Sequence, residues 1–355
     1  MKDKKKKWVI GTIIGTIGIL FSIALAMVIV DPYFHFHKPL SGISYALNNE
    51  RYMNDGIVKN FEYDAIITGS SMNQNFKTTT LDRLFGTTSV KTTFSGAGFQ
   101  EIADNLQRAC DSKNDVEMVV WGLDFNGLRR EHDWQGYTGY PDYLYDTNVW
   151  NDSSYVWNKS ILLSGLLNTI IDTLQGQEST TFDEYSSWEH ETGLDAISNT
   201  YVRSEEMAEE QMVLTDSEIQ MVTDNIANNI VAIANNNPDT TFYLFYTPYS
   251  ALYWESLYRA GELEKQIEAE TIATELMLTC ENIKLYNFSK ETDITEDLSY
   301  YRDKEHYSAE INEVILQWIK DDVGLVTVEN YQETIDWEQE YYMTYDYDGL
   351  YAKYQ

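Results

Sequence analysis

The sequence has very little cysteine. Only two cysteines, Cys110 and Cys280, occur among 355 residues, so the chain does not depend on a disulfide framework. Both lie in segments with the pattern of helices. The sequence leaves open whether they form one bridge or remain two buried free thiols.

Basic residues are also scarce. Lysine and arginine total 25 against 57 aspartates and glutamates, for a formal net charge of −32 at pH 7. Because the first seven residues, MKDKKKK, hold five lysines and one aspartate, the rest of the chain carries about −36. A surface this acidic repels polyphosphates, so nucleic acid is not an expected partner.

Metal-binding patterns are lacking as well. The chain has five histidines and no cysteine or histidine cluster with the spacing of a zinc site. The segment 346–349 (DYDG) resembles part of a calcium loop, but Thr344 and Gln355 would occupy its first and last ligand positions. We therefore expect no metal and no cofactor.

One long apolar run lies near the N-terminus, from Trp8 to Val30, and contains no charged residue. A helix of this length crosses a hydrocarbon layer of about 30 Å. The lysines before it predict a cytoplasmic N-terminus and a single membrane span over residues 1–30, with everything after Asp31 extracytoplasmic. The alternative is a cleaved signal peptide, which the length of the run and the lack of a clear A-x-A site disfavour.

The pattern after the membrane segment is that of an α/β protein. Residues 31–60 resemble a polar juxtamembrane stalk, and residues 61–325 alternate apolar strands with amphipathic helices. We predict strands at 63–68, 90–94, 116–123, 241–246 and 283–287, and helices at 80–85, 100–111, 216–236, 257–279 and 308–321. This alternation predicts a doubly wound, mostly parallel sheet with helices on both faces, a flavodoxin-like three-layer arrangement.

Two segments fall outside the regular alternation. Residues 127–215, rich in Trp, Tyr, Asp, Ser and Gly, are too long for an ordinary loop, so we interpret them as an inserted lid or binding element. The aromatic residues of this insertion could stack on sugar rings or could form the core of a lid. Residues 326–355 form an acidic, aromatic C-terminal tail that could add a helix or strand to the main domain.

Polar and glycine-rich segments follow the predicted strands. Because ligands bind beyond the carboxyl ends of parallel strands, these segments are candidates for a site. They are 69–72 (GSSM), 95–98 (SGAG), 122–126 (GLDFN) and 247–250 (TPYS), the last of which places Tyr249 beside the crevice. Far downstream, 303–307 (DKEHY) lies just before the final predicted helix.

A serine nucleophile needs a base, and the base needs an acidic group to orient it. Of the five histidines, two lie beside the membrane segment and two in the insertion, which leaves His306 near the predicted crevice. The D-x-x-H spacing lets Asp303 reach Nδ1 of His306 and leaves Nε2 free to face a serine. If Ser71 is that serine, its Oγ should lie about 2.6–3.2 Å from Nε2.

These blocks resemble the SGNH (GDSL-type) hydrolases over residues 60–125 and 283–321, in the same order. In that family a Gly-Asp-Ser turn follows the first strand, and a D-x-x-H motif closes the domain. The resemblance implies that Ser71 is the nucleophile, His306 the base and Asp303 its partner. It also implies that Gly96 or Gly98 supplies a backbone N–H, together with that of Ser71, to an oxyanion hole.

The third block departs from the family pattern. Where the family has G-x-N-D, with an asparagine amide that binds the oxyanion, this chain has Asp124. An ionised carboxylate would repel an oxyanion. Asp124 could be protonated, Asn126 could act as the donor, or the hole could consist of backbone groups alone.

The combination of one N-terminal span and an exported SGNH-like domain is similar to proteins that assist membrane-bound O-acyltransferases. The resemblance implies acyl transfer or ester hydrolysis on a cell-envelope glycopolymer, through an acyl-serine intermediate and with a possible membrane-bound O-acyltransferase as partner. The rival hypothesis is a catalytically inactive scaffold that binds a glycan or an acyltransferase. A lipase-like hydrolase is disfavoured because the insertion is rich in Asp, Asn and Ser.

Overall fold

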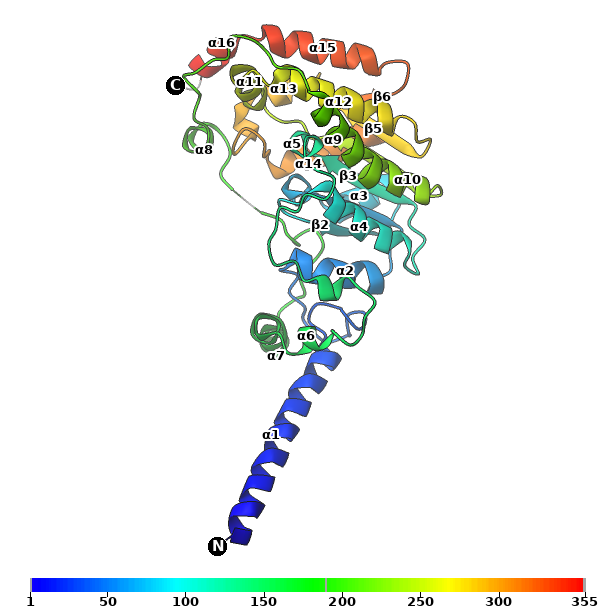
Figure 1. Ribbon diagram of the computed structural model, residues 1–355, viewed down its shortest axis with the longest axis vertical. Coiled ribbons are helices and arrows are strands. Elements are labelled where there is room, and N and C mark those ends of the chain that lie inside the picture. Colours follow the sequence, from blue (N-terminus) through cyan, green and yellow to red (C-terminus); the bar gives the residue numbers. More distant parts are fainter. Residues whose placement is uncertain (1, 189, 354–355) are drawn as a thin grey trace. The chain divides into compact units, whose positions relative to one another are not determined.

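The computed structural model describes residues 2–188 and 190–353 (Figure 1). The chain divides into two compact units. We call Met1–Phe61 together with Gly139–Thr181 the N-terminal unit, and Glu62–Thr138 together with Phe182–Gln355 the sheet unit.

The sheet unit contains a six-stranded sheet in the order β2-β1-β3-β4-β5-β6. All neighbouring strands are parallel except the last pair, β5 and β6, which is antiparallel. The first five strands therefore have the order of a flavodoxin-like doubly wound fold, and the predicted α/β class is confirmed. The strands are β1 (Ala65–Gly69), β2 (Ser89–Thr93), β3 (Met118–Leu123), β4 (Thr241–Tyr246), β5 (Ile283–Asn287) and β6 (Leu325–Val326).

The parallel strands end at one edge of the sheet. Gly69 pairs with Thr93 on one side and Gly122 on the other, and Tyr246 pairs with Leu123 and Asn287. The segments that follow β1, β2, β3 and β4 therefore meet at one rim, as expected from the sequence.

Helices form two groups. In the first group, α3 (Thr78–Phe85) contacts α14 (Ala309–Lys320). In the second group, α12 (Leu263–Met277) contacts α9 (Asp216–Ile226). The π-helical continuation of α9, Ala227–Val231, contacts α4 (Phe99–Cys110) in the same group. The step from β1 to β2 and the step from β2 to β3 run in opposite directions along the sheet, so right-handed crossovers place α3 and α4 on opposite faces. Figure 1 shows α9, α10 (Ala232–Asn236) and α12 side by side.

The prediction of one continuous helix at 257–279 is wrong, because the structure has two helices there. Helix α11 (Ala251–Ala260) ends at Gly261, which adopts a left-handed conformation with φ of 71°, and α12 begins at Leu263. A left-handed glycine terminates a helix because the chain turns away from the helix axis there. The other predicted strands and helices agree with the observed bounds within two residues. Strand β6 was not predicted, because two residues carry no recognisable period.

The insertion and the C-terminal tail both contain helices. Residues 139–181 of the insertion belong to the N-terminal unit, and residues 182–215 to the sheet unit, where they include α8 (Leu194–Thr200). In the tail, α15 (Tyr331–Thr344) contacts α11 and α12, and α16 (Tyr347–Ala352) contacts α11. Both cysteines are free, and burial raises the pKa of the Cys110 thiol to about 11.

The N-terminal unit begins with α1 (Lys2–Val30). Within residues 2–188 and 190–353, α1 is the one helix that is both long enough and apolar enough to cross a membrane, judged by its length and composition. The unit also contains α2 (Glu50–Asn60), α6 (Ser153–Val156), the π-helix Ile161–Leu167 and α7 (Asn168–Gln175).

A buried carboxylate organises the end of α1. Asp31 is fully buried and accepts hydrogen bonds from the backbone N–H groups of His35 (3.0 Å), Phe36 (2.7 Å) and His37 (2.9 Å). The hydroxyl of Tyr155 in α6 donates a fourth, at 2.8 Å. These bonds fix the turn by which the chain leaves α1.

Candidate active site

The site begins at a sharp turn after β1. Gly69 has φ of 135°, and a Cβ atom there would collide with the buried side chain of Asn73. Gly122, its neighbour on β3, has the same contact, so both strands need glycine at this point. The chain then enters a short 3-10 helix, Ser71–Asn73, in which Ser70 Oγ accepts a hydrogen bond from the Met72 N–H at 3.3 Å. This turn places Ser71 at the rim of the sheet.

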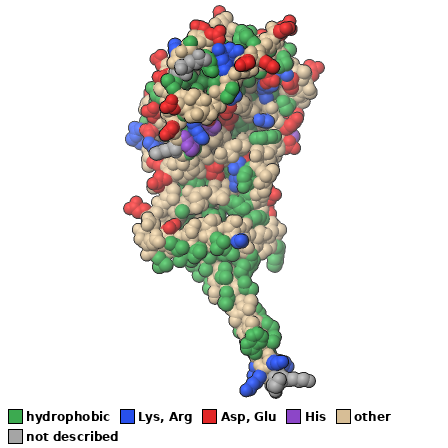
Figure 2. Space-filling model, turned by 90° about the vertical axis from the view of Figure 1, so that its left-hand side faces the viewer, with side chains coloured by type: hydrophobic (Ala, Val, Ile, Leu, Met, Phe, Trp, Pro, Cys, Tyr) green, Lys and Arg blue, Asp and Glu red, His purple; other side chains and the backbone are tan. Residues whose placement is uncertain are grey.

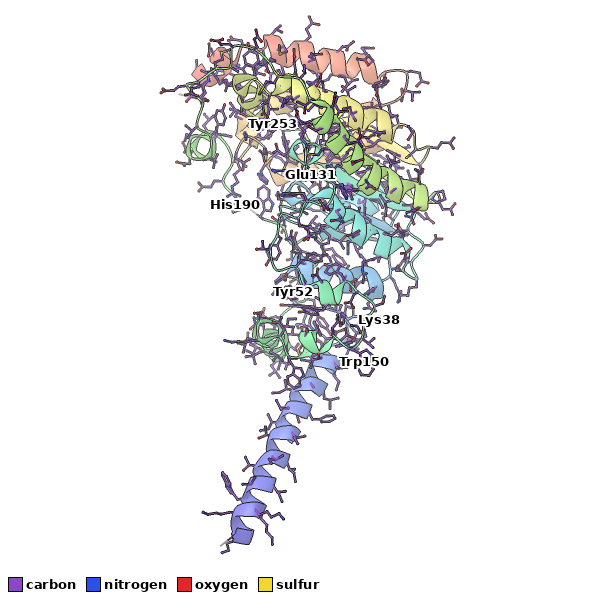
Figure 3. The ribbon with its side chains drawn as sticks, viewed as in Figure 1. Lys38, Tyr52, Glu131, Trp150, His190 and Tyr253 are labelled. Atoms are coloured by element: carbon purple, nitrogen blue, oxygen red, sulfur yellow. The ribbon has the colours of Figure 1, made fainter. Side chains whose placement is uncertain are left out.

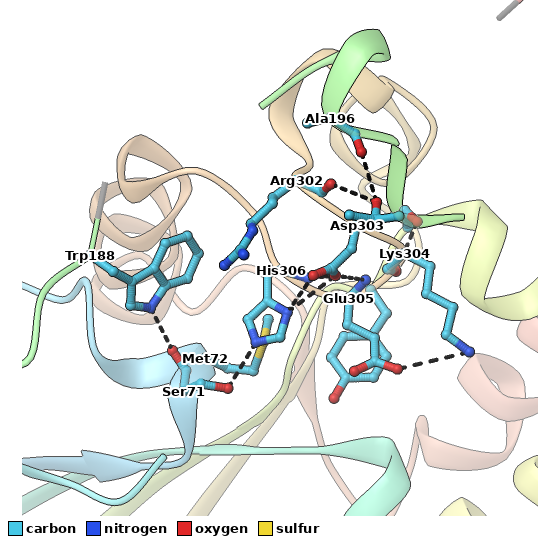
Figure 4. Close-up of polar contacts among 12 residues, drawn as sticks. Ser71, Met72, Trp188, Ala196, Arg302, Asp303, Lys304, Glu305 and His306 are labelled. Atoms are coloured by element: carbon cyan, nitrogen blue, oxygen red, sulfur yellow. Dashed lines mark hydrogen bonds and ion pairs between the residues drawn. The ribbon is translucent and has the colours of Figure 1, made fainter. Parts of the chain in front are cut away.

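Ser71, His306 and Asp303 form a continuous chain of hydrogen-bonding groups (Figure 4). Ser71 Oγ lies 2.8 Å from His306 Nε2, inside the range predicted from the sequence. On the other side of the ring, His306 Nδ1 lies 2.9 Å from Asp303 Oδ2 and 3.1 Å from Oδ1. Folding thus joins groups that are 235 positions apart in the chain.

The loop that carries the histidine is held in place by backbone contacts. Asp303 Oδ1 accepts hydrogen bonds from the N–H groups of Glu305 (2.8 Å) and His306 (2.7 Å). The Ser250 hydroxyl, just after β4, donates to the Lys304 carbonyl at 2.8 Å, and Tyr301 donates to the Pro248 carbonyl at 2.7 Å. The imidazole therefore has a fixed orientation before any ligand binds.

Charges in this group favour an ion pair. Burial alone would lower the pKa of His306, but the hydrogen bond and charge of Asp303 more than offset it, so the pKa lies above its ordinary value of 6.5. For Asp303, burial acts in the opposite direction and raises the pKa. The hydrogen bonds and the charge of His306 outweigh burial and bring the pKa of Asp303 below 3.8. Asp303 is thus a carboxylate that stabilises a protonated imidazole.

A cavity of about 150 Å³ opens beside Ser71 and His306. Gly96, Asp124, Asn126 and Tyr249 all line it, as does Trp134 from the insertion. Gly98 is not one of the lining residues. It is the buried residue before α4, and a Cβ atom there would collide with the backbone of Trp134. Of the two glycines proposed for the second block, Gly96 is therefore the one at the cavity.

Asp124 lies in the cavity wall and is bonded to Tyr249, whose hydroxyl donates to Oδ1 at 2.9 Å. Burial raises the pKa of Asp124 above its usual value, against the lowering effect of hydrogen bonds from Ser70 and Tyr249. The amide of Asn126 is turned elsewhere, since its Nδ2 donates to Glu305 Oε1 at 3.0 Å. One of its two N–H groups is therefore held by that carboxylate.

Trp188 is a neighbour of the site that sequence analysis missed. Its indole Nε1 donates to the Ser71 carbonyl at 3.4 Å, and its ring packs edge-on against His306 with 5.6 Å between ring centroids. Its own backbone N–H donates to Asn75 Oδ1 at 2.9 Å. Trp188 lies in the insertion outside any helix, in a segment without period, so no local pattern singled it out.

The aromatic residues of the insertion divide between the two units. Trp134 and Tyr137 belong to the sheet unit, whereas Tyr140, Tyr143, Tyr145 and Trp150 belong to the N-terminal unit. Arg130 stacks on the Trp134 ring, with 4.7 Å from its guanidinium carbon to the ring centroid. Across residues 2–188 and 190–353, no group of three or more His, Cys, Asp or Glu side chains is placed to hold a metal ion.

Comparisons with known proteins give one structural likeness. No family model matches the chain, and no curated protein matches it. A solved structure from Streptococcus pneumonia, described as that of "a putative platelet activating factor", superposes with a TM-score of 0.40 and 13% sequence identity, over 77% of this chain and 90% of that chain. A superposition this loose carries no argument about activity, so the function is inferred from the geometry of the site.

Proposed function

We propose that the sheet unit is an SGNH-type serine esterase or acyltransferase. In this proposal Ser71 is the nucleophile, His306 the general base and Asp303 the carboxylate that orients it. The contact of 2.8 Å between Ser71 Oγ and His306 Nε2, backed by Asp303 at 2.9 Å from Nδ1, is the observation that carries the proposal. This is the geometry that activates a serine hydroxyl.

The reaction would proceed in two halves. Ser71 Oγ attacks the carbonyl carbon of an ester while its proton passes to His306 Nε2, and the imidazolium then returns that proton to the leaving alcohol oxygen. The acyl group is left on Ser71. A hydroxyl acceptor, from water or a sugar, then attacks the acyl-serine with the same base, which gives hydrolysis or transfer.

At the step that stabilises the oxyanion, this chain differs from the SGNH pattern, because Asp124 stands where that pattern has an asparagine. We propose that the backbone N–H groups of Ser71 and Gly96 face the developing charge. Asp124 can add a donor only in its protonated form. Burial raises its pKa in that direction, whereas the hydrogen bonds that it accepts from Ser70 and Tyr249 favour the carboxylate. A neutral Asp124 would hydrogen-bond an oxyanion, whereas an ionised one would repel it.

The proposed substrate is an acyl ester of a cell-envelope glycopolymer. The helix α1 supports a membrane anchor with the sheet unit on the extracytoplasmic side. Trp134, on whose ring Arg130 stacks, adds aromatic surface to the cavity wall, where a sugar could pack. The cavity, about 150 Å³, is smaller than the roughly 300–1,000 Å³ of typical ligand pockets, which suits a short acyl group with the polymer outside it. A membrane-bound O-acyltransferase remains the partner that the family resemblance suggests.

Labelling with a fluorophosphonate tests the proposed nucleophile. The full chain in detergent should be labelled at Ser71, and Ser71→Ala should abolish the label. Ser217→Ala, at an exposed serine in the first turn of α9, is the matched control and should label like the wild type. Labelling that persists in Ser71→Ala would refute the assignment of the nucleophile.

A second candidate function is a catalytically inactive scaffold. Asp124, at the place of the oxyanion-binding asparagine, is the observation that favours it. The same experiment separates the two, because a folded wild-type protein that takes no label at any pH supports the scaffold.

A further inference from the structure

The N-terminal unit exposes an apolar helix face. Within the helical segment Ile161–Gln175, five large apolar side chains are exposed: Leu163 (52%), Leu167 (47%), Ile170 (36%), Ile171 (40%) and Leu174 (82%). No charged residue occurs between Ile161 and Ile171. An apolar strip of this size on a surface helix is costly in water and marks a contact with another apolar phase or partner.

The other face of this segment is anchored in the N-terminal unit. Gly165 packs against Pro32, where an added Cβ would lie 3.1 Å from the proline ring, and Leu166 is buried. Nearer its end, the Thr173 hydroxyl accepts a hydrogen bond from the Ser44 N–H at 2.9 Å. These contacts fix which face of the helix is exposed.

The segment lies against the apolar helix α1. A groove of about 600 Å³ is bounded by Leu166 and Ile170 on one side and by α1 on the other, where Gly15, Ser22 and Ala26 form part of its wall. At 1.5 Å per residue, these α1 positions lie roughly 6–22 Å from Val30 along the helix. If α1 spans a membrane, the groove therefore lies within the hydrocarbon and runs from the outer leaflet, about 15 Å thick, to just past the midplane.

The apolar surface continues around the end of α1. Figure 2 shows hydrophobic side chains gathered where α1 leaves the unit. Trp150, which is 87% exposed, lies close to this end of α1 (Figure 3), and Trp157 is 45% exposed. Lys38 lies nearby in the same view. Tryptophan and lysine are the residues that favour the headgroup region of a bilayer.

We propose that the segment Ile161–Gln175 lies in the outer leaflet as a second membrane contact, with its exposed apolar face among the acyl chains. In Figure 1, α7 is seen nearly along its axis whereas α1 runs down the picture, so the two helices cross rather than run in parallel. A helix that crosses a membrane span lies along the bilayer surface, as interfacial amphipathic helices do. The inference rests on the anchoring by α1 that is part of the proposed function.

The occupant of this surface is lipid rather than protein, because the apolar face is continuous with a helix that itself requires lipid. Two contacts, a span and an interfacial helix, would hold the N-terminal unit at a fixed tilt on the membrane, which a single span does not do. The polar exposed positions of the segment, Ser164, Asn168 and Gln175, form a separate arc that would face the headgroups.

Site-directed spin labelling tests the proposal. The full chain, with both cysteines changed to alanine, is reconstituted in vesicles of phosphatidylglycerol and phosphatidylcholine in equal parts. Nitroxide labels are placed one at a time at Leu167→Cys on the apolar face, Asn168→Cys on the polar arc and Ile17→Cys in α1. Collision rates with oxygen, which concentrates in lipid, and with a water-soluble nickel complex report the surroundings of each label.

The expected result is that the label at 167 collides with oxygen several-fold more, relative to nickel, than the label at 168. Equal nickel access at 167 and 168, with the label at 17 in lipid, overturns the inference and leaves the anchor intact. A label at 17 that meets nickel freely overturns the anchor and this inference together. A label at 167 shielded from both reagents overturns the inference in favour of a protein contact, and the circular dichroism spectrum of each variant shows that it is folded.

Discussion

Replacing Asp303 with asparagine tests the proposed triad at the group that would orient the imidazole. Asp303 Oδ1 accepts two backbone N–H groups, from Glu305 at 2.8 Å and His306 at 2.7 Å. An asparagine keeps those bonds only with its carbonyl oxygen at this position. Its NH2 group then faces His306 Nδ1, which lies 2.9 Å from the other oxygen in the native protein. Two donors cannot face each other, so Nδ1 must lose its proton and Nε2 must carry it.

The wrong tautomer blocks the first proton transfer. With a proton on Nε2, the ring can only donate to Ser71 Oγ, 2.8 Å away, and can no longer accept its proton. We expect the rate of fluorophosphonate labelling to fall about a thousandfold to ten-thousandfold, or roughly 4–5.5 kcal/mol in transition-state stabilisation. The backbone of the loop keeps its hydrogen bonds, so the fold should remain.

The pH profile gives a second, independent readout. The base must be neutral, so labelling of the wild type should rise with pH through the pKa of His306, which lies above 6.5 because of Asp303. In Asp303→Asn the negative charge that raises the pKa of His306 is gone, while burial still lowers that pKa. The acid limb of the variant should therefore move to lower pH even as its maximal rate falls. General unfolding would lower the rate without that shift.

The measurement is the second-order labelling rate from pH 5 to 9, with circular dichroism as the check on folding. Glu305→Gln is the matched control, because it removes a carboxylate of the same cavity that does not touch the ring nitrogens. We expect it to cost far less. A labelling rate for Asp303→Asn within about threefold of the wild type, with an unmoved acid limb, would refute the reasoning.

Three further changes probe the surroundings of the site and the fold. Trp188→Phe removes the hydrogen bond to the Ser71 carbonyl and should slow labelling about threefold to tenfold, whereas an unchanged rate would count against a positioning role. Gly69→Ala forces a side chain into a backbone with φ of 135° and against a buried asparagine, so chemical denaturation in detergent should show a loss of about 2 kcal/mol or more; a loss below 0.5 kcal/mol would contradict this. Glu338 on α15 and Glu270 form a buried, interacting pair of carboxyl groups. Burial raises the pKa of both, that of Glu338 from 4.5 to about 7. Protonation of the pair therefore stabilises the fold below pH 4.5, and the part due to Glu338 is lost as the pH rises through about 7. Glu338→Gln should flatten this part of the melting-temperature profile, and a slope equal to that of the wild type would show that Glu338 is not its source.

Much of the fold was predictable from local patterns. The strands 241–246 and 283–287 were predicted at their observed bounds, because short apolar runs bounded by polar residues leave few alternatives. The alternation with helices then fixed parallel pairing and placed the strand ends at one edge. The break at Gly261 was missed, since a glycine within a helical pattern is often tolerated.

The site was predictable to the extent that it depends on chain order. Ser71 follows a strand, and His306 with Asp303 forms a local pair, so their meeting at the rim follows from the topology. The contact of Trp188 with Ser71 and the hydrogen bond between Tyr249 and Asp124 could not be predicted from the topology. Both contacts join loop segments that are far apart in the chain, and no sequence pattern links those segments. The contacts form only when the loops pack against each other.

The sequence by itself determined five of the six strands, most helices of the sheet unit and the parallel class of the sheet, and it singled out the candidates for nucleophile and base, because periodicity and strand ends are local properties. Only the tertiary structure decided which of two glycines lines the cavity, which way the Asn126 amide points and how the insertion divides between two units. These depend on packing between segments far apart in the chain, where many side chains of similar character compete for the same neighbours.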